Sequence, residues 1–189
     1  MKSEYKIGII GPESCGKSTL TQQLAEHYSG TFVPEYARFF MEHLLENQPL
    51  GENFEKTEKE ISYTFEDVVM IARKQIEQIF AEYPSKYIFF DTELIITKVW
   101  FSDKYGIIPD FFTEALAKNP IDFYLLLAPD LAFEADPVRE NPMRREELFD
   151  WYKKELENYG FQYKIIDGIG DFRLKKAVAS IDNFVNSGK

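Results

Sequence analysis

Cysteine and histidine are scarce in this sequence of 189 residues, which has one cysteine and two histidines. The single cysteine, Cys15, cannot form a disulfide within the chain, and this usage is typical of a reducing compartment. His27 and His43 lie at no metal-ligand spacing to Cys15 or to an aspartate cluster. We therefore expect no disulfide or zinc framework, and the 44% of apolar residues must supply the core.

Basic residues and long apolar runs are also in short supply. Lys and Arg number 22 against 32 Asp and Glu, giving a net charge of -10, and such a surface repels phosphate backbones and anionic lipids. No apolar run approaches the roughly 18 residues of a membrane span. The start of the chain, MKSEYKIGII, has an acidic residue and too short an apolar run for a signal peptide. We expect a cytoplasmic protein that acts on small molecules rather than on nucleic acid or membranes; its oligomeric state is left open.

Short apolar runs alternate with segments of helical periodicity along the chain. The apolar runs predict strands at 5–10, 31–33, 86–91, 122–130 and 162–167. The intervening segments predict helices at 17–29, about 35–46, 57–83, 92–100 and 109–118, then one ending near 159 and one at 171–185. This order predicts an α/β fold of three layers, α/β/α, with a mostly or wholly parallel five-stranded sheet in one domain of residues 1–189.

The segment GPESCGKSTL follows the first predicted strand. Its Gly11, Gly16, Lys17 and Ser18 fit G-x-x-x-x-G-K-[ST], the P-loop, whose backbone amides and following helix N-terminus bind phosphate. Lys17 is expected to reach the β- and γ-phosphates of ATP, Ser18 to ligate Mg²⁺, and Thr19 to lie near the α-phosphate. The loop residues that complete this predicted ATP site are Pro12, Glu13, Ser14 and Cys15.

A chance match to this motif is expected in on the order of one per cent of chains of this length. The predicted strand before it and helix after it favour a true P-loop. The motif alone does not separate kinases, switch GTPases and motor ATPases. The guanine-specifying pattern Asn-Lys-x-Asp is absent, and the chain is short for most ATPase machines. These features favour a small-molecule kinase.

An arginine-rich segment, DPVRENPMRR, supports the kinase interpretation. Phosphoryl transfer needs positive charge on the moving group and exclusion of water, and arginines on a mobile loop supply both. We predict a mobile lid at about 132–146, in which Arg139 and Arg144 are catalytic. Arg145 is followed by two glutamates and fits a solvated helix face better.

Two carboxylates follow predicted strands and are expected at the ligand-binding edge of the sheet. Asp91 ends the strand YIFFD, where it would hold Mg²⁺ directly or through water. It could also cap the next helix, and the two roles can coexist. Glu35, in VPEYAR, could accept the proton of an attacking hydroxyl, or it could simply favour a helix start through its charge.

Three further residues are candidates for the substrate site. Arg38 lies close enough to Glu35 in the sequence to share the site. Tyr36 and Trp100 could stack on a flat base, although aromatic residues at helical spacing more often belong to a core. We favour Glu35 over Asp91 as proton acceptor, because Asp91 is better used on the metal.

Five segments of the chain carry a family resemblance: GPESCGKSTL, VPEYAR, DTELIITKVW, DFYLLLAPD and RREELFDWYKKEL. Together they resemble the ribosylnicotinamide kinase domain of NadR-type proteins over nearly the whole chain. The resemblance implies a P-loop kinase fold and phosphorylation of the 5′-hydroxyl of nicotinamide riboside to nicotinamide mononucleotide, with ATP and Mg²⁺. The H-x-G-H motif of the family's adenylyltransferase half and its N-terminal DNA-binding segment are missing, so the resemblance implies a stand-alone kinase.

The resemblance bears on two other regions. The segment DGIGDFR is similar to the part of related kinases that lies against the adenine, which places Gly168 and Arg173 there. In the lid, Pro137 stands where family members often have a glycine, and a proline would stiffen this loop. The alternatives to a nicotinamide riboside kinase are a kinase for another nucleoside or small alcohol and a non-catalytic ATP-binding module.

Overall fold

The computed structural model describes residues 2–47, 62–136, 139 and 141–187. The polar segment 48–60, the predicted start of the third helix at residue 57, and Pro137 lie outside these residues. Across the described part of the chain, no helix is long and apolar enough to cross a membrane.

A five-stranded sheet with the strand order β2-β3-β1-β4-β5 forms the centre of the structure. Every neighbouring pair of strands is parallel, which confirms the predicted sheet. The strands are β1 (Tyr5–Ile10), β2 (Thr31–Val33), β3 (Tyr87–Asp91), β4 (Phe123–Leu127) and β5 (Tyr163–Ile166).

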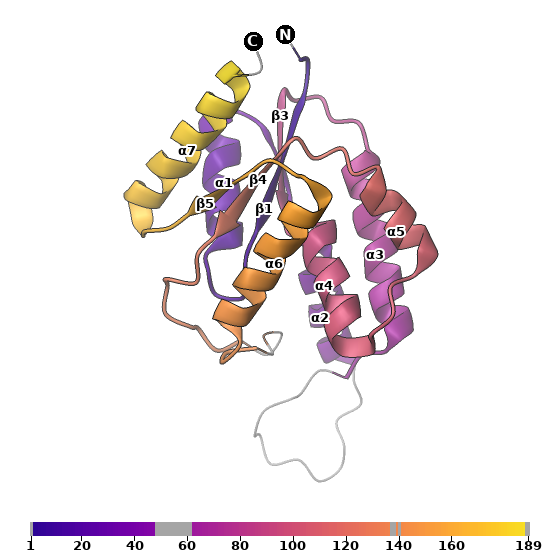
Figure 1. Cartoon of the computed structure of the whole chain (residues 1–189). Coiled ribbons are helices and arrows are strands. Elements are labelled where there is room, and N and C mark those ends of the chain that lie inside the picture. The colour runs from indigo at the N-terminus through magenta and orange to yellow at the C-terminus, as the bar shows by residue number, and fades with distance from the viewer. Residues whose placement is uncertain (1, 48–61, 137–138, 140, 188–189) are drawn as a thin grey trace.

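Helices cover both faces of the sheet. Figure 1 shows α1 and α7 together on one side and α3, α4 and α5 on the other. Over the described residues the helices are α1 (Lys17–Tyr28), α2 (Tyr36–Asn47), α3 (Phe65–Phe80), α4 (Leu94–Tyr105), α5 (Asp110–Ala117), α6 (Arg145–Tyr159) and α7 (Gly170–Ser187).

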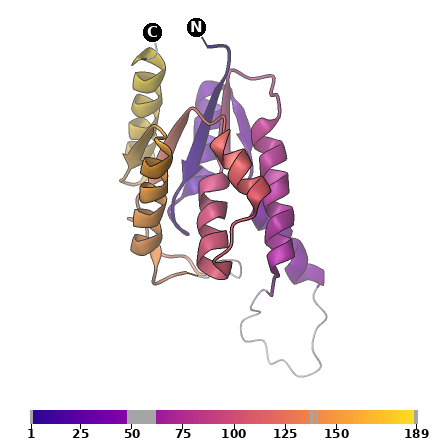
Figure 2. The same cartoon turned by 45° about the vertical axis from the view of Figure 1, so that its right-hand side comes forward.

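Alternating strand residues pack into two apolar cores. Ile7 and Ile9 of β1 belong to the core under α1 and α7, together with Leu24 and Ile181. Ile10 belongs to the opposite core, which contains residues of α3, α4, α5 and α6. Figure 2 shows the molecule with the α3, α4 and α5 side turned forward. Both faces of the sheet are therefore buried, as expected for a parallel sheet, and the predicted three-layer α/β/α fold is confirmed.

The third helix begins later than its apolar pattern suggests. Thr64 Oγ1 accepts a hydrogen bond from the Asp67 amide at 3.2 Å, and Asp67 Oδ2 accepts one from the Thr64 amide at 2.7 Å. This capping box satisfies amides that a helix start leaves unpaired. The helix therefore starts at Phe65, and the prediction that it includes residues 62–64 is wrong.

The fourth helix starts at Leu94 and ends at Tyr105, well beyond its predicted end. Its N-cap is Glu93, whose Oε1 accepts a hydrogen bond from the Ile95 amide at 2.7 Å. The alternative in which Asp91 caps this helix is therefore wrong. The Asp91 carboxylate is left for the site described below.

Gly8 of β1 lies where β4 brings Tyr124 against its backbone. A methyl group on Gly8 would lie 2.9 Å from Tyr124 Cδ1 and 3.3 Å from Glu93 Cγ. We expect Gly8→Ala to lower the free energy of unfolding by about 1–3 kcal/mol, because added volume in a packed core forces side chains from their preferred positions. Urea unfolding followed by circular dichroism measures this change. Tyr124→Leu should reduce the cost of Gly8→Ala, and an equal cost in both backgrounds would contradict the packing argument.

Candidate active site

The P-loop, residues 11–18, connects β1 to α1 and lines a cavity of about 360 Å³. The neighbours of β1 are β3 on one side and β4 on the other, so this cavity lies where the strand order reverses, the usual ligand position in such sheets. The sequence-predicted residues that line it are Gly11, Glu13, Ser14, Cys15, Gly16, Lys17, Ser18, Thr19, Glu35, Arg38, Trp100 and Arg139. Pro12, Tyr36, Asp91, Arg144, Gly168 and Arg173 lie outside this lining.

Three residues give the P-loop its tight curl. The angle φ is 151° at Gly11, 54° at Ser14 and 79° at Gly16. A side chain on Gly11 would lie 2.8 Å from the carbonyl oxygen of Leu127, so glycine is required there. Ser14 holds a positive φ that non-glycine residues rarely adopt, and such backbone strain is typical of functional sites.

Lys17 starts α1, and its side chain folds back over the P-loop. Its Nζ donates hydrogen bonds to the carbonyl oxygens of Gly11 at 3.1 Å and Pro12 at 2.9 Å. Burial alone would lower the pKa of Lys17, but the surrounding acidic groups, Glu35 and Asp91 among them, raise it above its ordinary value. Lys17 therefore carries a positive charge that could bind phosphate oxygens.

Cys15 is fully buried, and burial raises the pKa of its thiol. Its sulfur fills the space beside Gly11. A buried thiol with a raised pKa is a poor nucleophile. Cys15 can therefore contribute to ligand binding through its backbone only.

Asp91 ends β3 beside Ile9 of β1 and is 3% exposed. Burial raises the pKa of Asp91, while a hydrogen bond from Ser18 and the charge of Lys17 oppose that rise. Its Oδ1 has no hydrogen-bond partner among the described residues.

A buried carboxylate oxygen without a partner, next to a hydroxyl, fits a Mg²⁺ ion, which in phosphate sites takes one or two protein ligands. Ser18 and Asp91 are the residues that could hold it. The described ranges contain no cluster of three or more His, Cys, Asp or Glu side chains suited to a metal, so the remaining ligands would be phosphates and water.

Glu35 reaches the cavity from the connection between β2 and α2. Burial raises the pKa of Glu35 to about 7; the charge of Asp91 adds to this rise, and Lys17 and Arg38 oppose it. A carboxylate with a pKa near neutrality can take up and release a proton at working pH. Its position therefore fits the predicted role of proton acceptor.

Thr92 lines the cavity next to Asp91, and the sequence analysis missed it. Its φ of 69° is rare for a β-branched residue. No local pattern in the sequence signals this conformation, which turns the chain from β3 toward α4.

The part of the cavity that lies against α4 and α6 is mostly aromatic and aliphatic, with the charged residues Asp103 and Lys104 at α4. Trp100 Nε1 donates a hydrogen bond to the Tyr63 hydroxyl at 3.0 Å, and the two rings meet edge to face with centroids 5.2 Å apart. Other residues of this part are Ile96, Val99, Leu148 and Tyr152. Tyr63 was not predicted as a site residue. Its only signal in the sequence is that it is an aromatic residue soon after a polar segment.

Tyr36 does not line the cavity, and its predicted role as a stacking residue stays a prediction. Its ring packs near Phe39 and Phe40, at centroid distances of 6.0 and 6.4 Å. Arg38 does line the cavity. It forms ion pairs with Asp136 at 2.5 Å and with Glu42 at 3.0 Å, and so joins α2 to the lid segment.

The predicted lid arginines occupy different surroundings. Arg139 donates hydrogen bonds to Ser14 Oγ at 2.9 Å and to the Glu134 carbonyl oxygen at 2.5 Å, which places it at the P-loop. Arg144 is instead bound by Asp103 at 2.8 Å and by Glu147 at 2.6 Å. A role for Arg144 at the phosphates would require these ion pairs to break.

Arg145 donates hydrogen bonds to the carbonyl oxygens of Ser14 at 3.2 Å and Leu131 at 2.8 Å. Its interpretation as part of a solvated helix face is therefore wrong. The helix start at Arg145 turns this side chain toward the P-loop, whereas Arg144, one position earlier, faces Asp103.

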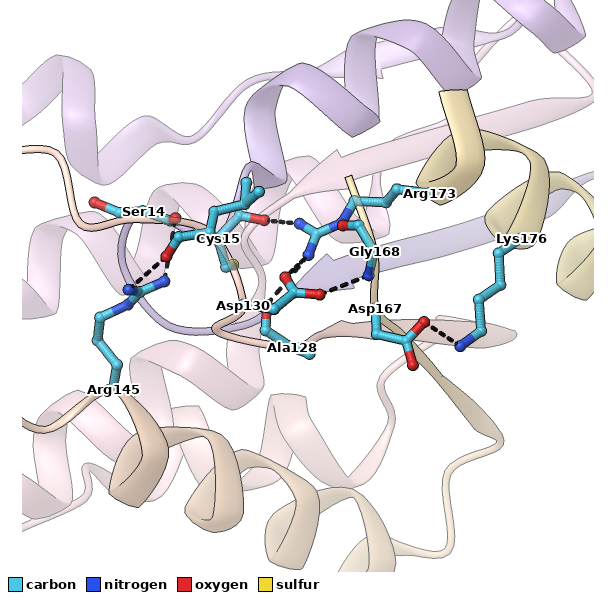
Figure 3. Close-up of polar contacts among 10 residues, drawn as sticks. Ser14, Cys15, Ala128, Asp130, Arg145, Asp167, Gly168, Arg173 and Lys176 are labelled. Carbon is cyan, nitrogen blue, oxygen red and sulfur yellow. Dashed lines mark hydrogen bonds and ion pairs between the residues drawn. The ribbon is translucent and has the colours of Figure 1, made fainter. Parts of the chain in front are cut away.

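Arg173 is 4% exposed, and its guanidinium is used by the protein itself (Figure 3). It donates hydrogen bonds to the carbonyl oxygens of Cys15 and Gly168 and forms an ion pair with Asp130. These contacts hold its side chain inside the protein, and its predicted place against an adenine stays a prediction. Gly168 lies in the same network, because its amide donates to Asp130 Oδ2 at 2.6 Å.

A P-loop after the first strand, a carboxylate at the end of the adjacent strand and a parallel sheet between two helical layers define a P-loop protein with a kinase-like fold. A family model described as an AAA domain matches residues 6–173, so the chain belongs to this AAA-domain family.

Among curated proteins, the chain is similar to the trifunctional NAD biosynthesis/regulator protein NadR of Salmonella typhimurium, with 26% identity over 70% of this chain and 30% of that protein. The chain thus spans about a third of the length of this relative. Two crystal structures of NadR protein have the same fold. The one in complex with NR covers 96% of this chain and 52% of its own at 21% identity and a TM-score of 0.73. The one with NAD and AMP-PNP covers 96% and 50% at 20% identity and a TM-score of 0.71.

A nucleotide kinase shares the fold as well. Thymidylate kinase from Ehrlichia chaffeensis is 12% identical, with a TM-score of 0.61 over 95% of this chain and 100% of its own. The fold is therefore that of P-loop nucleoside and nucleotide kinases.

Glu35→Gln should change how stability depends on pH. Because the folded protein raises the pKa of Glu35 from 4.5 to about 7, its protonated form stabilises the fold below pH 4.5, and this contribution is lost as pH rises through 7. The melting temperature of Glu35→Gln relative to wild type should therefore increase between pH 5 and 7 and level off above 8. Differential scanning calorimetry without ligands measures it. Glu26→Gln, at an exposed site on α1, is the control, and a pH-independent difference for Glu35→Gln would contradict the raised pKa.

Proposed function

We propose that this chain is an ATP-dependent kinase that phosphorylates the 5′-hydroxyl of nicotinamide riboside and yields nicotinamide mononucleotide. One observation carries the proposal: the P-loop and Lys17 share a cavity with Glu35, beside the buried Asp91, and part of that cavity is aromatic. Residues 1–189 would act as one domain, with 132–146 as its lid, in the cytoplasm.

The phosphates of ATP would bind to the P-loop amides and to Lys17. Lys17 would then exchange the Gly11 and Pro12 carbonyl oxygens for the β- and γ-phosphates. A Mg²⁺ ion held by Ser18 and Asp91 would neutralise part of the phosphate charge. Arg139, already at the P-loop, would add positive charge next to the γ-phosphate.

In the transfer step, the 5′-oxygen of the riboside forms a bond to the γ-phosphorus while the bond from that phosphorus to the bridging oxygen of ADP breaks. Glu35 takes the hydroxyl proton, for which its pKa of about 7 is suited. Most of the rate would come from positioning and from fixed charge, because phosphoryl transfer needs little covalent chemistry from the protein.

The acceptor pocket fits a flat cationic ring. The nicotinamide of the riboside carries a positive charge, and Trp100 offers a π system in the cavity. Tyr63 already has a cation over its ring, because Lys104 Nζ lies 5.0 Å from the ring centroid. Cations are attracted to aromatic faces. The similarity to NadR protein, which was crystallised with NR, supports this choice of acceptor.

A panel of acceptors with ATP and Mg²⁺ tests the function. Nicotinamide riboside should be phosphorylated with a higher kcat/KM than uridine, cytidine or thymidine. Lys17→Ala should lower kcat/KM by about 10³-fold or more, because it removes preorganised charge from the transition state, while circular dichroism shows the fold intact. Lys74→Ala, at an exposed site on α3, should have no effect. Near-normal turnover by Lys17→Ala, or no transfer to any acceptor, would refute the proposal.

Variants of Glu35 and Asp91 should differ in how their reaction rates depend on the Mg²⁺ concentration. Glu35→Gln removes the proton acceptor and should lower kcat by about 10²–10⁴-fold, with the Mg²⁺ concentration for half-maximal rate unchanged. Asp91→Asn weakens the proposed metal site and should raise that concentration. Initial rates over a Mg²⁺ titration give both values. If Glu35→Gln shifted the metal requirement and Asp91→Asn did not, the two assignments would have to be exchanged.

A further inference from the structure

Two arginines from distant segments hold consecutive carbonyl oxygens of the P-loop. Arg145 of α6 donates to the Ser14 carbonyl oxygen at 3.2 Å, and Arg173 of α7 donates to that of Cys15. Figure 3 shows the two guanidinium groups on either side of this stretch of backbone. Neither side chain lines the cavity, so both act on the loop from behind.

Holding a carbonyl oxygen also orients the next amide. In a trans peptide the C=O and the following N–H point in opposite directions, and the described residues contain no cis peptide bond. With the Ser14 and Cys15 carbonyl oxygens held by arginines, the amides of Cys15 and Gly16 point the other way. Cys15 and Gly16 both line the cavity, where phosphate would bind.

The backbone around these peptides needs outside support. Ser14 and Gly16 have φ angles of 54° and 79°, on either side of Cys15. A serine in this region is strained and persists only where neighbouring groups hold it. The two arginine contacts lie at this strained stretch.

Arg173 is itself fixed in place. Its guanidinium also donates to the Gly168 carbonyl oxygen and, at 3.4 Å, to that of Ala128, and it pairs with Asp130. Asp130 in turn accepts a hydrogen bond from the Gly168 amide at 2.6 Å. Arg145 has fewer contacts, since its buried Nε has no partner within the described ranges. Arg173 is thus the more strongly held of the two.

We propose that Arg173, assisted by Arg145, is a positioning residue that presets the Cys15 and Gly16 amides of the P-loop for the β-phosphate of a nucleotide. The inference rests on the proposed ATP binding but needs no phosphoryl acceptor. A nucleotide that ends at its α-phosphate depends less on these amides, because it places no β-phosphate in the loop.

Binding of ADP and AMP to the full chain, measured by isothermal titration calorimetry with Mg²⁺, tests this. Arg173→Lys keeps the positive charge but cannot make the same set of hydrogen bonds. It should weaken the binding of ADP about 10- to 100-fold, the range expected for losing charge-assisted hydrogen bonds. AMP binding should change less than about 3-fold. Arg145→Lys should have a smaller effect on ADP. Lys176→Met, one turn further along α7 and paired with Asp167 at 2.6 Å, is the matched control and should bind both nucleotides like wild type.

An NMR measurement distinguishes a loss of amide positioning from a general loosening of the protein. The Gly16 amide proton should move downfield when ADP binds to the wild type, and this NMR shift should be lost in Arg173→Lys. Asp130→Asn keeps the arginine but removes its ion pair, and it should weaken the binding of ADP about 3- to 10-fold. If Arg173→Lys does not fold, this variant tests the positioning role in its place.

Equal weakening of ADP and AMP, or unchanged ADP binding in Arg173→Lys, would overturn the positioning role alone. A wild type that binds no ADP would overturn the proposed kinase function together with it.

Discussion

The direction of the P-loop amides is the constraint on which the rest of this site depends. A phosphate is bound by several N–H groups that converge on one point, and such convergence requires positive φ angles at Gly11, Ser14 and Gly16. Leu127 crowds Gly11 so closely that no side chain fits there. The carbonyl oxygens of Ser14 and Cys15 find donors elsewhere, in Arg145 and Arg173.

Charge balance explains the state of the residues around that loop. The charges of Glu35 and Asp91 raise the pKa of Lys17, and the charge of Lys17 in turn lowers the pKa of both carboxyl groups. Burial is the main cause of the raised pKa of Glu35, and the negative charge of Asp91 adds to it. Asp91 Oδ1 has no hydrogen-bond partner among the described residues. An opposite charge nearby favours the ionised form of a carboxyl group, so Lys17 and the two carboxyl groups stabilise one another's charged forms.

The sequence predicted what depends on local patterns. The P-loop has four fixed positions between a strand and a helix, and the strands are short apolar runs, so the sheet and the loop could both be predicted. The orientation of Tyr36 depends on how α2 packs, and the contacts of Arg144 and Arg145 depend on where α6 begins. The start of α3 at Phe65 was missed because a capping box overrides apolar periodicity. No local pattern could reveal that Arg173 supports Cys15, because these residues are 158 positions apart.

That separation has a consequence for how the protein becomes functional. Contacts between segments far apart in sequence form late in folding, because the entropy of closing a long loop must be overcome first. The P-loop is synthesised well before Arg173, which lies in α7, the last of the described helices. A nascent chain can therefore complete β1, β3 and β4 before Arg173 is available to contact the Cys15 carbonyl oxygen. Under the proposed role of Arg173, tight binding of a nucleoside diphosphate would follow only after α7 has docked beside α1.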